Sequence, residues 1–181
     1  MTCVIAMRES EKGIVHIAAD RAISNGGVAN SGGSKLARFP SGLVVGFAGS
    51  LATQNLMVTR SELADCDLSI DQSIATLFDK FSGVDSFQLP GAAPTTFWAI
   101  MLLAMNDTLV WMGSVGGWHR VADPVRSIGD GERIALGSWF ERGDLQPKER
   151  LQRAIEAAGT FMPGVVSKES DYDRTGSILL E

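Results

Sequence analysis

Apolar positions in the first part of the chain form two pairs of short runs, and a polar turn divides each pair. The first pair spans residues 2–8 and 14–20, with the stretch ESEKG between them. The second pair spans residues 35–39 and 43–49, on either side of the turn PSG. Short apolar runs bounded by turn residues are typical of strands. The pattern therefore predicts two β-hairpins, with Asp20 closing the second strand.

The period of the pattern changes after the second hairpin. Apolar residues recur at helical spacing over residues 50–66 and again over 69–81, which predicts two helices. Ser69 is a suitable N-cap for the second helix, and Asp71 lies in its first turn, where a negative charge is favourable. Between the hairpins, residues 21–35 are rich in glycine, serine and asparagine without any period, and we expect a loop there.

The second half of the chain predicts five more elements after a glycine- and proline-rich connector. They are two strands, two helices and a final strand, at residues 95–105, 108–121, 132–142, 147–162 and 175–181. The turn Asn106-Asp107 separates the two long strands. Pro147 stands at the first turn of the last helix, where proline is tolerated.

The order of these elements limits the fold class. Strands do not alternate singly with helices, so a doubly wound parallel sheet is disfavoured. Two packed sheets with helices on both outer faces fit the order better. We therefore expect an α+β protein with a single domain over residues 1–181.

Charge and composition exclude several function classes. The net charge is −5 and no run of lysine or arginine is present, which argues against nucleic-acid binding. No apolar stretch reaches the length of a membrane span, and the first residues lack the pattern of a signal peptide. With Cys3 and Cys66 as the two cysteines, we expect a cytoplasmic protein with reduced thiols.

Common catalytic and cofactor motifs are missing from the sequence. In the glycine-rich loop Lys35 follows Ser34, which is not the order of a phosphate-binding loop. The histidines, His16 and His119, have no acidic or thiol ligands beside them at metal-binding spacing. Neither histidine is accompanied by a GxSxG nucleophile motif. We expect no cofactor and no metal.

Thr2 is the residue that chemistry favours as a nucleophile. Initiator methionine is commonly removed before a small residue, and removal of Met1 would give Thr2 both a hydroxyl and a free α-amine. A free α-amine titrates at about pH 7.7–8.0, so it is a usable base near neutral pH. Threonine paired with an N-terminal amine is one of the known activated nucleophiles. One residue would then supply both nucleophile and base.

Three further residues complete this hypothesis. A cation near the amine would lower its proton affinity, and Lys35, at the start of the next hairpin, is the natural candidate. Asp20 would pair with Lys35 and orient it. Gly49, where the GFAGS turn enters a predicted helix, would offer its backbone N–H to an oxyanion.

At this point the sequence resembles the proteasome β-subunit and HslV peptidase family of N-terminal nucleophile hydrolases. The matching stretches are TCVIAMRESEKGIVHIAADRA, SKLARF, LVVGFAGS and SIGDGERIAL. They occur in the family's order and at close to its spacing, whereas the middle and the last third match mainly in element order. The resemblance implies a four-layer αββα sandwich, assembled into a homo-oligomeric double ring around a chamber.

The resemblance also implies a function and a site. Thr2 would be the nucleophile of a threonine-type endopeptidase acting on unfolded polypeptides, with an ATP-dependent unfoldase ring as partner. Asp20 and Lys35 fall on the family's supporting acid and lysine, and Gly49 falls on its oxyanion-hole glycine. The substrate would lie as an extended strand beside Ala22, Ile23 and residues 47–49. Phe47 would narrow the first specificity pocket if its ring points there.

Two segments depart from the family pattern at the site. After Gly129 the family often has a serine that contacts the N-terminal threonine, and this chain has Asp130. Its carboxylate would either hold the amine protonated, or bind Lys35 or a water in place of the hydroxyl. Near the chain end the family's Asp-x-x-Ser-Gly is replaced by DYDRTG. The possible supports for the amine there are Asp173, Thr175 and Ser177.

Two other functions remain open beside the peptidase. One is a non-catalytic ring or scaffold subunit on the same fold, for which the Asp130 departure leaves room. The other is an amidohydrolase of the same superfamily that acts on a small molecule. Fold alone does not decide among the three. Assembly into a ring would separate the peptidase from the small-molecule amidohydrolase.

Overall fold

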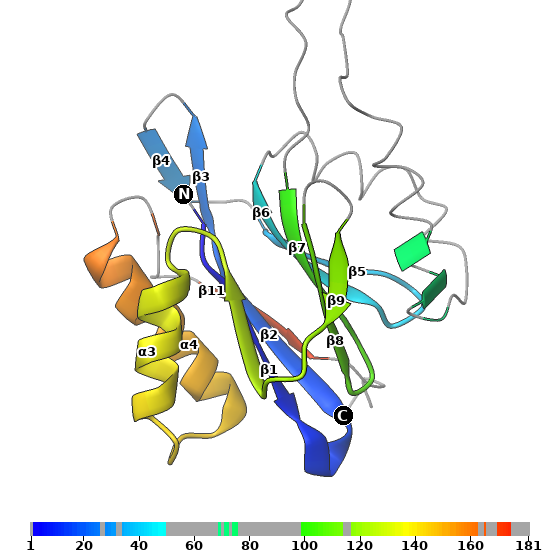
Figure 1. The fold of residues 1–181 in the computed structure, drawn as a ribbon. Coiled ribbons are helices and arrows are strands. Elements are labelled where there is room, and N and C mark those ends of the chain that lie inside the picture. The colour runs from blue at the N-terminus through cyan, green and yellow to red at the C-terminus, as the bar shows by residue number, and fades with distance from the viewer. Residues whose placement is uncertain are drawn as a thin grey trace, which may run out of the picture.

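The computed structural model forms two antiparallel sheets, a separate hairpin and a pair of helices (Figure 1). It describes residues 2–25, 28–31, 34–49, 69, 71–72, 74–75, 99–113, 117–162, 165 and 170–174.

The first sheet contains the start of the chain. Its strand order is β10 (Val125–Ile128), β1 (Val4–Glu9), β2 (Ile14–Asp20) and β11 (Ser170–Arg174). A short 3₁₀ helix, η1 (Ser10–Lys12), and Gly13 in the left-handed region at φ 65° connect β1 to β2. The register places Val4 opposite Ile128 on one side and opposite Ala19 on the other. The predicted first hairpin is therefore confirmed, and it forms the centre of this sheet.

The second sheet is built from the second predicted hairpin and the strands that follow it. Its order is β5 (Leu36–Arg38), β6 (Val44–Gly49), β7 (Ala99–Met105), β8 (Thr108–Met112) and β9 (Trp118–Arg120). Asn106, at φ 52°, makes the tight turn between β7 and β8. Residues that alternate along β6 and β7 point to opposite faces of this sheet, as the pleat requires.

Two helices, α3 (Glu132–Glu141) and α4 (Pro147–Phe161), cover the outer face of the first sheet (Figure 1). Pro147 is the first residue of α4, as the sequence predicts. The order of layers is thus helices, first sheet and second sheet. No helix among the described residues is long and apolar enough to cross a membrane.

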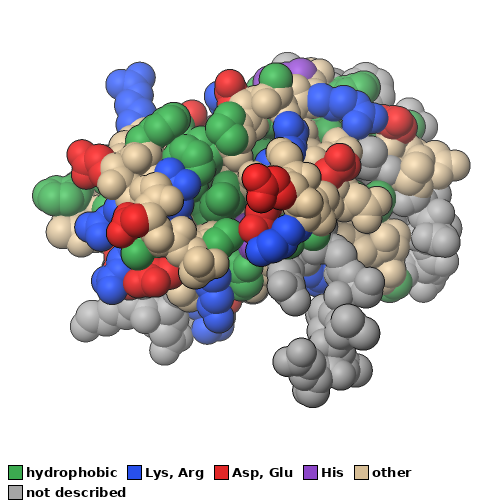
Figure 2. Space-filling view, turned by 90° about the horizontal axis from the view of Figure 1, so that it is seen from below, with side chains coloured by type: hydrophobic (Ala, Val, Ile, Leu, Met, Phe, Trp, Pro, Cys, Tyr) green, Lys and Arg blue, Asp and Glu red, His purple; other side chains and the backbone are tan. Residues whose placement is uncertain are grey.

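Each interface between layers has its own apolar cluster. One side of β1 packs against α3 and α4 through Ile5 and Met7, joined by Cys3 just before the strand. The other side faces the second sheet through Val4 and Ala6. This alternation explains the nearly unbroken apolar run at the chain start, because the strand is buried on both faces. On the face of the molecule seen in Figure 2, acidic and basic side chains are interspersed among apolar ones.

The outer face of the second sheet carries a third apolar cluster, which includes Phe39, Phe47 and Ile74. Residues 71–72 and 74–75 are helical. Ser69 and Gln72 form a reciprocal capping box, with Gln72 N donating to Ser69 Oγ at 3.3 Å and Ser69 N to Gln72 Oε1 at 2.9 Å. The predicted N-cap is therefore confirmed. Most of the two predicted helices at 50–66 and 69–81 lies outside the described residues, so the four-layer sandwich stays a prediction.

Several short strands correct the sequence interpretation. The predicted loop at 21–35 contains a hairpin of β3 (Ala22–Asn25) and β4 (Val28–Ser31). The predicted strand at 108–121 is divided into β8 and β9, and a hydrogen bond from Gly113 N to Gly117 O closes the gap at 2.8 Å. The apolar pattern does not predict strands β10 and β11, and the predicted strand at 175–181 lies outside the described residues.

Candidate active site

Thr2 lies just before β1, and the turn between β10 and α3 holds its backbone on both sides. The Thr2 N–H donates to Asp130 Oδ2 at 3.2 Å. The Thr2 carbonyl oxygen accepts from Gly131 N, also at 3.2 Å. Thr2 is 8 % exposed. The atom that would become the α-amine therefore faces a carboxylate from a residue 128 positions away.

Glycines allow the turn to approach Thr2 so closely. Gly129 has a φ of 92°, which L side chains rarely adopt. A Cβ there would stand 2.9 Å from the Thr2 carbonyl carbon and closer still to its oxygen. A Cβ on Gly131 would stand 2.8 Å from Cys3 Cβ. The IGDG sequence thus brings the Asp130 carboxylate to Thr2 through backbone contacts that larger residues would prevent.

Asp20 is the last residue of β2 and lies beside the start of β1. Its carboxylate accepts hydrogen bonds from three donors. Its Oδ1 accepts from Cys3 N at 2.7 Å and from Lys35 Nζ at 2.7 Å. Its Oδ2 accepts from Ala22 N at 3.1 Å. The carboxylate is fully buried, so these charge-assisted hydrogen bonds compensate for lost hydration. The predicted pairing of Asp20 with Lys35 is present in the structure.

Lys35 is itself buried, and its burial and the nearby negative groups shift its pKa in opposite directions. Burial lowers the pKa of Lys35 below its usual range, and the Asp20 carboxylate opposes that shift without cancelling it. Cys3 and Asp130 act on this pKa in the same sense as Asp20. The Lys35 carbonyl accepts from Phe47 N at 3.0 Å, which ties the start of β5 to β6. A cation, a buried carboxylate and Asp130 therefore share the neighbourhood of Thr2.

Cys3 is next to Thr2 but is a poor nucleophile. Burial, reinforced by the charge of Asp20, raises the pKa of the Cys3 thiol to about 12. The thiolate is the reactive form of cysteine, so Cys3 is inert near neutral pH. Ser127, also fully buried, donates its hydroxyl to the Val4 carbonyl at 2.7 Å. Packing therefore accounts for the buried Cys3 thiol, and the hydrogen bond to the Val4 carbonyl accounts for the buried Ser127 hydroxyl.

Comparison with known proteins identifies the fold. No family model and no curated protein matches the sequence. Among solved structures, the complex of Thiobacillus denitrificans BPH with epoxomicin has a TM-score of 0.75 at 17% identity, covering 96% of this chain and 98% of that one. Eukaryotic HslV from Trypanosoma brucei has a TM-score of 0.72 at 18% identity, with the same coverage. This chain has the HslV fold. BPH alone gives a TM-score of 0.73 at 17% identity, with 97% of each chain covered.

Within the HslV fold, the residues expected to bind substrate lie on β3 and β6. Ala22 is buried and begins β3, where Ile23 pairs with Asn30 of β4. The Phe47 side chain is 3 % exposed and packs in the apolar cluster on the outer face of the second sheet. Gly49 ends β6 at a φ of 142°, a conformation that L side chains rarely adopt. The roles of these four residues stay predictions.

The residues expected near the chain end are only partly described. Asp173 lies on β11 opposite Ile17 and makes a two-pronged ion pair with Arg38 of β5. Thr175 and Ser177 lie outside the described residues. Ser170 of β11 lies opposite Asp20 in the first sheet. The sequence analysis did not place this residue near the site. No signal marked it, because the run SDYDR is polar and lacks the apolar pattern of a strand.

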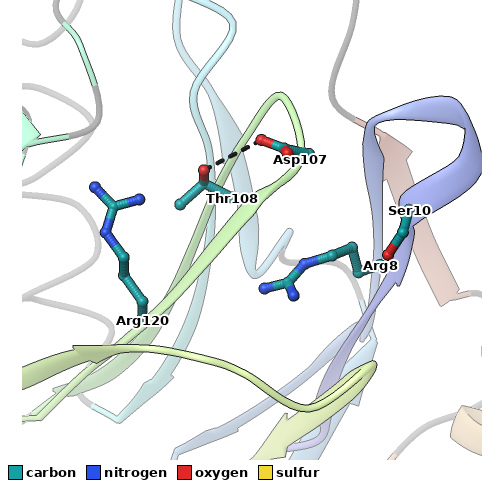
Figure 3. Close-up of a pocket in the computed structure, with 5 residues that line it drawn as sticks. All are labelled: Arg8, Ser10, Asp107, Thr108 and Arg120. Atoms are coloured by element: carbon teal, nitrogen blue, oxygen red, sulfur yellow. Dashed lines mark hydrogen bonds between the residues drawn. The ribbon is translucent and has the colours of Figure 1, made fainter.

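A cleft of about 310 Å³ opens at the other end of the sandwich from Thr2. The residues that line it are Arg8, Ser10, Asp107, Thr108 and Arg120 (Figure 3). Arg8 donates to the Val121 carbonyl, and Arg120 pairs with Asp71 at 2.8 Å. Arg8 sits near the far end of β1, several strand residues beyond Thr2, so this cleft is separate from the predicted active site.

Proposed function

We propose that this chain is a threonine-type peptidase of the HslV kind, with Thr2 as the nucleophile once Met1 has been removed. One observation carries the proposal. The buried ion pair of Asp20 and Lys35 adjoins Thr2, because Asp20 Oδ1 accepts from both Lys35 Nζ and the backbone N–H of Cys3. The combination of a hydroxyl, an adjacent amine and a buried cation is what activates an N-terminal nucleophile.

The reaction follows from these groups. The neutral α-amine takes the proton of the Thr2 hydroxyl as the oxygen attacks the scissile carbonyl carbon. The developing oxyanion accepts from the Gly49 N–H. The ammonium then returns the proton to the leaving amine as the C–N bond breaks, which leaves an ester on Thr2. A water molecule, deprotonated by the amine, hydrolyses the ester and regenerates the hydroxyl.

Lys35 and Asp20 act on this cycle through charge. In this proposal Lys35, held at 2.7 Å from Asp20, is the cation that favours loss of the proton from the Thr2 hydroxyl. Asp20 fixes the lysine and, through Cys3 N, the start of β1. The resemblance to proteasome β-subunits and HslV extends the proposal to unfolded polypeptide substrates, a double ring of identical chains and an ATP-driven unfoldase.

A non-catalytic ring subunit is the second candidate, and the Asp130 contact favours it. A carboxylate that keeps the terminal amine protonated withholds the base that the mechanism needs. The two candidates differ in whether Thr2 reacts at all.

Hydrolysis of an unfolded polypeptide such as reduced casein distinguishes the two candidates. We expect activity in the wild type, retention in Thr2→Ser, and a loss on the order of a thousandfold or more in Thr2→Ala, because that change removes the nucleophile. Thr108→Ala, in the far cleft, is the matched control and should leave the rate unchanged. Equal rates in Thr2→Ala and the wild type would refute Thr2 as nucleophile.

A further inference from the structure

Asp130 occupies a place that none of the proposed catalytic steps uses. Its Oδ2 lies 3.2 Å from Thr2 N. The same turn places Gly131 N on the Thr2 carbonyl oxygen, and Gly129 against the Thr2 backbone. The carboxylate is therefore positioned by a turn whose other contacts also hold Thr2.

We propose that Asp130 is a positioning residue that binds the terminal amine of Thr2 and sets the pH at which this amine becomes available as a base. The inference rests on the proposed function and deepens it. It assigns to Asp130 an ionic contact with the ammonium form of Thr2, formed when removal of Met1 turns the present amide N–H into a charged donor. The catalytic step itself is unchanged.

The sign of the effect follows from the charges around Thr2. An opposite charge within hydrogen-bond distance stabilises the protonated amine. Among the described residues, the other charged groups that act at this position are Asp20 at the end of β2, Lys35 just before β5 and Glu132 at the start of α3. Asp20 and Lys35 neutralise each other as an ion pair, and Cys3 is an uncharged thiol. Asp130 and Glu132 therefore leave an excess of negative charge beside the amine.

The size of the effect is limited by solvent. Asp130 is on the surface, where water screens ion pairs. A partner at this distance shifts a titration by about 1 to 3 pH units, and we expect the lower end of that range. The amine can accept the hydroxyl proton only when it is neutral. Reaction of Thr2 is therefore slowed near neutral pH and reaches its full rate at more alkaline pH than it would without Asp130.

Two substitutions and a control isolate the charge. Asp130→Asn keeps the shape and one oxygen acceptor but removes the charge, and Asp130→Ser introduces a short hydroxyl. Asp107→Asn removes a carboxylate in the far cleft. In each protein, with Met1 confirmed absent, two quantities are measured against pH. One is the rate of Thr2 modification by a peptide epoxyketone, and the other is labelling of the Thr2 amine by an amine-specific reagent, read by mass spectrometry.

We expect the acid limb of both profiles to move to lower pH by about one unit in Asp130→Asn and Asp130→Ser, with Asp107→Asn unchanged. At neutral pH this corresponds to a rate increase of about tenfold in the two variants, shrinking at alkaline pH. Labelling profiles that coincide in the wild type and both variants would overturn the inference. Labelling that shifts without any epoxyketone reaction would support the Asp130 contact and refute the peptidase proposal instead.

Discussion

Gly129 is the residue on which the geometry at Thr2 depends most closely. Its φ of 92° turns the chain back toward Thr2 at the end of β10, and its missing Cβ leaves room for the Thr2 carbonyl group. Gly42, in the turn before β6, has a similar φ of 83°, but a Cβ added there would meet nothing within 4 Å. Substitutions at these two glycines therefore distinguish the effect of backbone strain, which both share, from the effect of contact with Thr2, which only Gly129 has.

Gly129→Ala should lower both stability and reactivity. The strained backbone costs on the order of 1–3 kcal/mol of unfolding free energy, and the clash with the Thr2 carbonyl group moves the nucleophile out of its position. Urea unfolding and the rate of casein hydrolysis measure the two effects. Gly42→Ala should cost comparable strain while hydrolysis by the folded protein stays at the wild-type rate. If Gly129→Ala kept full activity, the turn would not position Thr2.

Individual residues differ in how far the sequence determines their roles. The Asp20–Lys35 pair is predictable because both residues stand at ends of strands in hairpins whose apolar runs are clear. The sequence leaves the partner of Asp130 open among the amine, Lys35 and a water. Its carboxylate lies on a turn far along the chain, and which donor it meets depends on the φ of Gly129 and on the register of β1 with β10.

At the scale of elements, a strand that is buried on both faces is the easiest to predict from the sequence. Strands β1, β2, β6 and β7 carry apolar runs because residues on both faces of each strand are buried. Strand β11 is short and polar, and side-chain pairs add to its backbone ladder with β2. Tyr172 Oη lies 2.6 Å from His16 Nδ1, and Asp173 pairs with Arg38. Such pairs join residues that are distant in the sequence, so no local pattern predicts them.

Helix α3 shows a second limit of local patterns. Its position after the IGDG turn predicts it, and it extends over Glu132–Glu141, although Gly137 in its interior is a poor helix former. Its buried residues, Ala135 and Trp139, face the first sheet. Packing of this face, together with α4, outweighs the cost of the glycine.

At the scale of the whole molecule, the two sheets meet closely because of a glycine in β6. A Cβ on Gly46 would stand 2.6 Å from Val4 Cγ1 and 2.9 Å from Ile17 Cδ1, both on the first sheet. Valine is β-branched and has little rotamer freedom with which to move aside. The spacing between the sheets therefore depends on Gly46, and the site at the strand ends depends on that spacing.

Gly46→Ala should destabilise the protein by about 1–3 kcal/mol, because overpacking forces strands or side chains apart. Gly137→Ala is the matched control, since a Cβ there meets nothing within 4 Å and alanine favours the helix by about 0.5–1 kcal/mol. Denaturant unfolding of the two variants should give shifts of opposite sign. A Gly46→Ala protein as stable as the wild type would contradict the close packing of the sheets.

The overall order of layers is predictable because strands and helices occur in blocks along the chain. The resemblance in the first hairpins then specifies the HslV fold, which the structural comparison supports at 17–18% identity. The helical layer expected on the outer face of the second sheet is represented by Ile74, packed in that face's apolar cluster. Polypeptide cleavage and ring assembly belong to the proposed function, because fold alone does not establish them.

The most direct test of the central claim is the intact mass of the protein after treatment with a peptide epoxyketone such as epoxomicin. This reagent forms its ring adduct with a hydroxyl and an adjacent free amine, so it reports on both groups of Thr2 together. We predict a chain that lacks Met1 and carries one adduct on Thr2, with no adduct in Thr2→Ala. A chain that lacks Met1 and remains unmodified across the pH range in which its amine is neutral would contradict the account.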